Sequence, residues 1–174
     1  MVSLEVIAIV LTGVGVIISV LYYSMVLQNS NKARQAQLYV QIWNQFNSQD
    51  FFEKYFDVLN QKWEDYEDYQ MKYGNLRFTD TKKYAKNVSI GAYFEGVGVL
   101  LKHGLIDIDL VVDLMGTTIL FYWDKISPII KEFRVRNRNS RAYHYLEYLY
   151  EHAKPIILQQ HPEIKEATPP KPDN

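Results

Sequence analysis

The sequence predicts an all-α protein, with one N-terminal transmembrane helix followed by a compact bundle of about four to five helices. A stretch without a single charged residue occupies positions 6–27. Beyond it, apolar residues recur at the spacings of three and four that place them on one face of a helix, and no alternating strand pattern is present. No proline precedes Pro128, so nothing interrupts long helices before that point.

The overall composition excludes several classes of protein. The 174 residues carry 19 Lys and Arg side chains against 20 Asp and Glu side chains, a formal net charge of −1. This balance argues against a generally basic nucleic-acid-binding protein. Hydrophobic residues make up 48% of the chain, which is too many for a disordered protein. The absence of cysteine excludes disulfides, thiolate metal sites and cysteine nucleophiles.

Residues 6–27 are long enough to cross a membrane. As a helix rising ~1.5 Å per residue they span ~33 Å, against a hydrocarbon core of ~30 Å. A cleaved signal peptide needs a basic start and a small-x-small cleavage site, whereas this segment follows Glu5 and ends in Tyr22-Tyr23-Ser24-Met25. A buried core helix seldom runs this far without a charge. We therefore expect an uncleaved anchor over residues 1–29, with the lipid bilayer as its partner.

Basic residues near the anchor predict its orientation. No Lys or Arg precedes the apolar stretch, and Lys32 and Arg34 follow it. The positive-inside rule then places the N-terminus outside and the rest of the chain in the cytoplasm. The expected location is the cell membrane, with a single pass and a helical cytoplasmic domain over residues 30–160.

Small residues form a stripe along one side of the anchor. Ala8, Thr12, Gly15 and Ser19 recur at spacings of four, three and four, and the rest of the span is chiefly Val, Ile and Leu. Small residues allow close approach of helices in lipid, so the stripe predicts an interface with a second copy or with another membrane subunit. The alternative is chance, because small residues are common in membrane helices.

Helical periodicity continues beyond the anchor. Residues 31–47 carry Leu38, Ile42 and Phe46 four apart, which predicts an amphipathic helix, either separate from the span or continuous with it. The further expected helices are residues 49–72, 80–103, 108–126 with a continuation over 129–135, and 141–153. Residues 161–174 hold four of the six prolines and are expected to form a disordered, proline-rich tail.

Capping residues set the expected helix boundaries. The expected N-caps are, in chain order, Asn47 or Ser48, Thr79 or Asp80, Asp107, and Ser140. The expected helix ends are Gly74, Gly104 and Pro155, and Pro128 is expected either to kink its helix or to separate it from the continuation. The apolar stripe expected on the helix over 49–72 consists of Phe52, Phe56, Leu59, Trp63 and Tyr66.

The glycine-rich segment over residues 91–104 is the first candidate for chemistry. A phosphate-binding loop uses bare backbone N–H groups, but this segment lacks the Walker Gly-Lys-Ser/Thr ending and follows no strand. The favoured interpretation is that Gly91, Gly96 and Gly98 let two helices pack closely. Glu95 lies in the same apolar stretch and needs a partner, which an Arg, a Lys or a Tyr hydroxyl can supply. We expect Glu95 to form an ion pair with Arg134 or to share a hydrogen-bond network with it. A catalytic carboxylate with a raised pKa is the alternative.

Acidic and histidine residues give weaker candidates. Asp107 and Asp109 lack the later ligands of a calcium loop and are expected to cap a helix. One helical face carries His144, Glu147 and Glu151. A di-iron bundle needs a matching His/Glu motif on a second helix, and the sequence has none. A solvated face is therefore expected, and no catalytic, cofactor-binding or metal-binding residue is assigned.

Two charged clusters stand out. Residues 50–72 carry seven acidic side chains, and residues 131–141 form a basic cluster of Lys131, Arg134, Arg136, Arg138 and Arg141. One interpretation is that both are ordinary solvated faces that pair with each other. The other is that the basic cluster contacts anionic lipid headgroups, at ~1 kcal/mol per residue. Nucleic acid is not an expected partner, because the domain as a whole is neutral.

One segment carries a resemblance. The run from Tyr93 to Asp107, followed by Trp123, Pro128-x-Ile130 and Arg134, is similar to a domain-of-unknown-function family of small prokaryotic proteins with one N-terminal membrane helix and a helical cytoplasmic domain. The similarity covers roughly residues 30–155 and supplies no catalytic residue. It implies scaffold positions, or an undiscovered site, at Glu95, Gly98, Gly104, Asp107, Trp123 and Arg134.

Two functional hypotheses follow. The first is a membrane-anchored helical interaction or accessory module without an identifiable catalytic activity or cofactor. The second is a small membrane-bound enzyme that uses a buried Glu95 or an uncharacterised metal site on His144 and Glu147.

Overall fold

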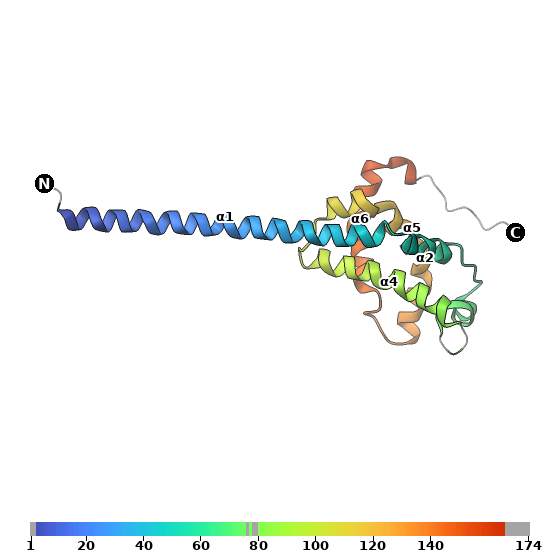
Figure 1. Ribbon diagram of the computed structural model, residues 1–174. Helices are drawn as coiled ribbons and strands as arrows, with labels where there is room; N and C mark the ends of the chain where they lie inside the picture. Colours follow the sequence, from blue (N-terminus) through green and yellow to red (C-terminus); the bar gives the residue numbers. More distant parts are fainter. Residues whose placement is uncertain (1–2, 76, 78–79, 166–174) are drawn as a thin grey trace. The chain divides into compact units, whose positions relative to one another are not determined.

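The structure is a computed structural model that describes residues 3–75, 77 and 80–165. Its elements are α1 (Leu4–Phe46), α2 (Gln49–Leu59), α3 (Tyr66–Tyr69), the π-helix η1 (Gln70–Gly74), α4 (Thr81–Lys102), α5 (Ile108–Arg136), α6 (His144–Gln160) and the 3₁₀-helix η2 (Pro162–Lys165) (Figure 1). The described residues contain no strand. The predicted fold class is confirmed: a long apolar N-terminal helix is followed by a helical bundle.

Helix α1 is continuous, which answers the question left open by the sequence. The segment predicted over residues 31–47 continues the apolar stretch in a single helix. Large apolar side chains between Leu4 and Leu27 are exposed; Ile9, for example, is 72% exposed. Among the described residues, α1 is the one helix long and apolar enough to cross a membrane.

The chain divides into two units, Met1–Gln41 and Ile42–Asn174, and the second contains the bundle. Within it, α4 and α5 both pack against α6, and α2 packs against α4 and α5. The α6 side chains that enter the core are completely or almost completely buried: Leu146, Leu149, Ala153 and Ile157. Their spacing of three, four and four is the apolar stripe of a helix that faces a core.

Helix α2 is shorter than predicted, and the expected helix over residues 49–72 is wrong. The chain leaves the helix after Leu59 because Gln61 turns inward. There the Gln61 side chain donates to Asn87 Oδ1 at 2.7 Å, and its backbone carbonyl accepts from Lys125 Nζ at 2.7 Å. These tertiary contacts outweigh the helical periodicity of the local sequence.

The buried face of α2 is also different from the predicted stripe. The core side chains are Phe51, Tyr55 and Val58, whereas Phe56 of the predicted stripe is 53% exposed. Both sets have helical spacing, because aromatic residues occupy two adjacent faces of this helix. The spacing alone therefore did not identify which face packs against α4 and α5.

Several predicted boundaries are confirmed. Ser48 Oγ accepts from Phe51 N–H, and Asp80 and Asp107 accept from the first-turn N–H groups of α4 and α5. These contacts satisfy helix donors that have no partner within the helix. Gly104 has φ +65°, a left-handed conformation that favours glycine, directly after α4.

Pro155 does not end its helix as predicted, and Pro128 does not separate α5 from a continuation. Helix α5 continues through Pro128, and the residue with non-helical angles is Met115 (φ −148°, ψ 17°). Helix α6 continues through Pro155 to Gln160. Both prolines are exposed, so water can reach the carbonyl groups that lose an N–H partner there.

Helix α6 begins at His144 rather than at 141, and its N-cap is Tyr143 instead of Ser140. Of the predicted tail, Pro162–Lys165 form η2, and Ile164 packs against the core cluster that includes Ala153. Residues 166–174 lie outside the described part of the chain.

Glycines allow the close approach of α4 to the start of α6. A Cβ atom on Gly98 would lie 2.1 Å from the Tyr145 carbonyl oxygen, and one on Gly91 would lie 2.4 Å from Tyr143 Cε1. The packing interpretation is thus confirmed at these two positions. It is wrong at Gly96, where no atom lies within 4 Å of the added Cβ.

This contrast gives a matched pair of variants. Gly98→Ala should lower the free energy of unfolding by about 1–3 kcal/mol, because backbone atoms of α6 must move. Gly96→Ala should leave it unchanged or raise it by up to about 1 kcal/mol, since alanine favours an exposed helix interior. Chemical denaturation followed by circular dichroism measures both. Equal effects of the two variants would contradict the close approach.

Candidate functional site

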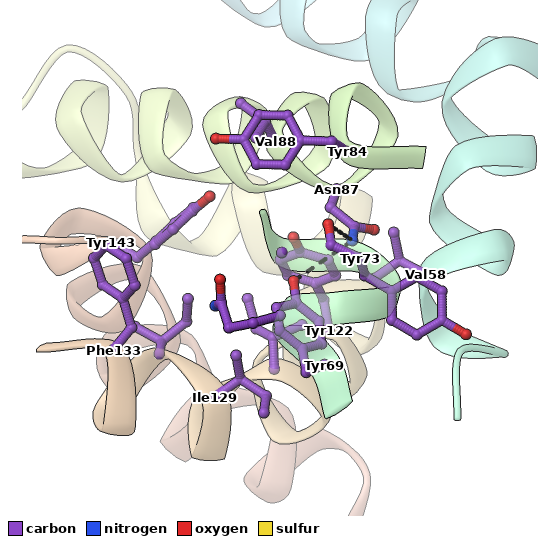
Figure 2. Close-up of a pocket in the computed structure, with 14 residues that line it drawn as sticks. Val58, Tyr69, Tyr73, Tyr84, Asn87, Val88, Tyr122, Ile129, Phe133 and Tyr143 are labelled. Carbon is purple, nitrogen blue, oxygen red and sulfur yellow. Dashed lines mark hydrogen bonds between the residues drawn. The ribbon is translucent and has the colours of Figure 1, made fainter. Parts of the chain in front are cut away.

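A pocket of about 140 Å³ lies inside the second unit, between α2, α3, η1, α4, α5 and the residue that precedes α6 (Figure 2). Five tyrosines line it: Tyr69, Tyr73, Tyr84, Tyr122 and Tyr143. The apolar part of the wall consists of Val58, Val88, Ile126, Ile129, Ile130 and Phe133. None of the described lining residues carries a charged side chain.

One face of α5 supplies much of the wall. Tyr122, Ile126, Ile129 and Phe133 follow at spacings of four, three and four, so they share one side of the helix. Figure 2 shows Ile129 and Phe133 on one side of the pocket and Tyr84 and Val88 of α4 on the other.

The end of α3 and the π-helix η1 contribute one tyrosine each, Tyr69 and Tyr73. The Tyr69 and Tyr73 rings lie 5.9 Å apart between centroids, and Trp63 packs edge-on against Tyr69 at 5.2 Å. Gly74 ends η1 where a Cβ would lie 2.8 Å from Tyr69 Cε1. Single π-turns occur often at functional sites, which makes this side of the pocket a candidate for ligand contact.

Asn87 is the polar residue at the centre of this side. Its Oδ1 accepts from Gln61 Nε2, and its Nδ2 donates to the Tyr73 carbonyl at 3.3 Å. The Tyr69 hydroxyl accepts a longer bond from Nδ2, at 3.5 Å. Gln61 Oε1 is buried without a partner among the described residues. These bonds tie α2, η1 and α4 together next to the pocket.

Tyr122 is the most buried of the tyrosines that line the pocket. Tyr122 is 2% exposed, and within the described chain its hydroxyl makes no hydrogen bond. Burial raises its pKa well above the usual value, with smaller contributions from Tyr143 and Tyr69. Burial also raises the pKa of Tyr69 and of Tyr143. The three phenols therefore stay neutral and able to donate at physiological pH.

Tyr143 reaches the pocket because its backbone is held in an unusual conformation. Its φ of +53° is left-handed, which is uncommon for a residue with a large side chain. The Tyr143 carbonyl accepts from Arg134 Nη2 at 3.2 Å and from the Glu147 N–H at 3.2 Å. Its ring lies over Gly91, where no side chain competes for the space.

Arg134 holds the segment before α6. Its Nη1 pairs with Glu147 Oε2 at 2.6 Å, and its Nε donates to the Ala142 carbonyl at 2.8 Å. The guanidinium carbon lies 6.0 Å from the centroid of the Trp123 ring. Arg134 therefore joins α5, the connecting segment and α6.

The predicted pair between Glu95 and Arg134 is wrong. Glu95 Oε2 instead accepts from the Leu146 backbone N–H at 2.7 Å. That N–H belongs to the first turn of α6, where helix donors lack internal partners and negative charge is favoured. Glu95 is thus a cap supplied by a neighbouring helix, while Arg134 takes Glu147 as its partner.

The enzyme alternative named residues that the fold uses structurally. Glu95 caps α6 and Glu147 pairs with Arg134. In the part of the chain that the structure describes, no group of three His, Asp or Glu side chains is placed to hold a metal ion. Asp107, which sequence reasoning assigned as a cap, accepts from the Asp109 N–H.

The basic cluster is divided between paired and unpaired side chains. Arg134 is engaged as described, and Arg136 pairs with Glu132 at 2.6 Å and with Glu67. The Arg136–Glu67 pair joins the basic cluster to the acidic segment, as the solvated-face interpretation expected. The side chains that remain exposed without an ion pair among the described residues are Lys131, Arg138 and Arg141.

Sequence reasoning missed the pocket, because its tyrosines come from separate elements with no common spacing. The high tyrosine content, fourteen in 174 residues, was the one feature of the sequence that pointed to a tyrosine-lined site. The scaffold positions implied by the family resemblance lie outside the pocket lining, in two parts of the fold. Gly104 and Asp107 form the turn between α4 and α5, and Glu95, Gly98, Trp123 and Arg134 surround the start of α6.

Comparisons with known proteins give one match. The model of a family described as "Domain of unknown function (DUF4760)" matches residues 8–153. Searches of curated proteins and of solved structures found no match.

The ion pair at the start of α6 predicts a contrast between two arginines. Arg134→Gln should lower the free energy of unfolding by about 3 kcal/mol, because it leaves Glu147 unpaired in a largely buried position. Arg136→Gln, which removes two exposed ion pairs, should cost less than about 1 kcal/mol. Urea denaturation of both variants measures the difference. A loss at Arg134 no larger than at Arg136 would contradict the role assigned to this segment.

Proposed function

The chain belongs to the DUF4760 family, and from this premise we propose that it is a membrane-anchored helical interaction or accessory module. The observation that carries the proposal is the apolar first half of α1. Its large side chains are exposed along the whole stretch from Leu4 to Leu27, so they need lipid or protein to cover them.

The polar groups of this stretch also suit a bilayer. Thr12 Oγ1 donates to the Ala8 carbonyl at 2.9 Å, and Ser19 Oγ donates to the Gly15 carbonyl at 2.8 Å. Helical backbone groups are satisfied within the helix, and these two hydroxyl groups find partners there as well. Thr12 and Ser19 therefore bring no unsatisfied hydroxyl donor into the hydrocarbon.

The charges that flank the span support one orientation. Lys32 and Arg34 follow it, and no basic residue precedes it. With the N-terminus outside, the helical bundle is cytoplasmic and the protein is a single-pass protein of the cell membrane.

An accessory module acts through contacts, and two surfaces are available. The stripe of Ala8, Thr12, Gly15 and Ser19 is exposed, and nothing lies within 4 Å of a Cβ atom placed on Gly15. A second copy or another membrane subunit fits this stripe. Lys131, Arg138 and Arg141 are exposed and suit contact with anionic lipid headgroups.

A module is favoured over an enzyme by what the candidate catalytic groups do. The Glu95 carboxylate is held by the Leu146 N–H, and removing it from that position would leave the start of α6 without its cap. The Arg134–Glu147 pair engages the other carboxylate. The two carboxylates considered as catalytic groups, Glu95 and Glu147, thus stabilise the fold.

Orientation is testable because the chain contains no native cysteine. In intact cells, an impermeant thiol reagent should label a Ser3→Cys variant and leave a Lys62→Cys variant unlabelled until lysis. Both positions are exposed on the protein, so a difference reports the side of the membrane. Labelling of Lys62→Cys without lysis, or recovery of the chain in the soluble fraction, would contradict the proposed topology.

The stripe is tested by adding bulk to one face of the span. Gly15→Ile should reduce cross-linking or a membrane two-hybrid signal at least several-fold, because close backbone approach is lost. Val14→Ile, on another face of the helix, should leave the signal unchanged. If the two variants behave alike, the stripe is not an interface and the span is a plain tether.

A further inference from the structure

We propose that the tyrosine-lined pocket binds a small neutral compound of one ring that carries a hydrogen-bond-accepting oxygen, such as a cyclic ketone. The proposal concerns the second unit alone and does not depend on the membrane topology.

The size of the pocket sets the size of the ligand. A volume of about 140 Å³ is close to that of an apolar protein cavity that accepts benzene, about 150 Å³. Sites for larger organic ligands measure about 300 Å³ or more. One ring with a short polar substituent is therefore the largest compound that fits without rearrangement.

The hydrogen-bonding groups of the wall set the polar part of the ligand. Tyr122 lines the pocket and is 2% exposed. No described residue accepts a hydrogen bond from its hydroxyl. The hydroxyl is not itself a buried unpaired atom, so it is reached from the pocket, where it can donate to an acceptor oxygen of a ligand. Tyr143 and Tyr69 are its electrostatic neighbours, which places further phenol groups beside the same space.

The charge of the surroundings excludes an ionic ligand. No described lining residue is charged, so an ion would be buried without a counter-ion, at high cost. Burial raises the pKa of the Tyr143 phenol, with smaller contributions from Tyr84 and from the negative charge of Glu95. This negative charge disfavours a carboxylate or phosphate, and neutral tyrosines leave a neutral acceptor as the fitting group.

The walls suit a ring. Tyr69, Tyr73 and Tyr122 present aromatic surface, and Ile129 and Val58 present aliphatic surface, around the same space (Figure 2). Planar and near-planar rings pack well against such surfaces. Apolar contact then supplies affinity, and the Tyr122 hydroxyl supplies selectivity for an acceptor oxygen.

The experiment compares cyclohexanone with methylenecyclohexane, which has the same shape and no acceptor oxygen. The full chain, in detergent and with ¹³C-labelled tyrosine rings, is titrated with each probe and followed by NMR. We expect shifts at Tyr122, Tyr69 and Tyr143, and about tenfold tighter binding of the ketone, as one buried hydrogen bond implies.

Two variants and one control locate the contact. Tyr122→Phe keeps the ring, removes a hydroxyl that has no protein partner, and should abolish the preference for the ketone without loss of stability. Val88 lines the pocket and is 39% exposed, so Val88→Phe adds a larger side chain there and should block binding of both probes. Tyr150→Phe removes a hydroxyl bonded to Asp124 outside the pocket and should change neither affinity.

Equal affinity for the two probes in the wild-type chain would overturn the proposal. It would also fail if the preference survived in Tyr122→Phe, or if the shifts appeared only at tyrosines outside the pocket. In those cases the pocket holds solvent, and partition of the probes into detergent accounts for the signal.

Discussion

The structure of the bundle depends on how the start of α6 is held. Helix N-termini carry backbone donors without internal partners, and here Glu95 of α4 accepts one of them. From α5, Arg134 binds the carbonyl groups of Ala142 and Tyr143 and pairs with Glu147. One short segment thus receives a carboxylate from one helix and a guanidinium from another. Gly98 completes the arrangement by leaving room for the Tyr145 carbonyl.

The same arrangement shapes the pocket. Tyr143 precedes α6 in a left-handed conformation, and the contacts of its carbonyl fix the direction of its ring. On the opposite side, the bonds of Asn87 to Gln61 and to the Tyr73 carbonyl fix the end of α2 and the π-helix. The pocket therefore lies between two sets of hydrogen bonds, those of the Tyr143 carbonyl and those of Asn87, which hold the backbone of Tyr143 and Tyr73.

Much of the fold followed from local sequence chemistry. The exposed apolar stretch, the caps at Ser48 and Asp107, and the left-handed Gly104 depend on neighbours in the sequence, and all were predictable. The end of α2 at Leu59 was not, because it depends on Asn87, which lies far along the chain. The partner of Glu95 was missed for another reason: sequence reasoning sought a side chain, and the fold supplied a backbone N–H. The pocket could not be predicted because it depends on the positions of five elements, α2, α3, η1, α4 and α5, and of the residue before α6.

The position of α6 in the chain has a consequence for biogenesis. Proteins are synthesised from the N-terminus, and the residues of α4 and α5 therefore leave the ribosome before the α6 residues that cover them. Until Leu146, Leu149 and Ile157 have emerged, the apolar faces that α6 buries stay open, and Glu95 has no helix to cap. The nascent bundle is thus exposed to aggregation and proteolysis during a defined interval of translation. A chain that stops within that interval leaves the apolar faces of α4 and α5 without the helix that covers them.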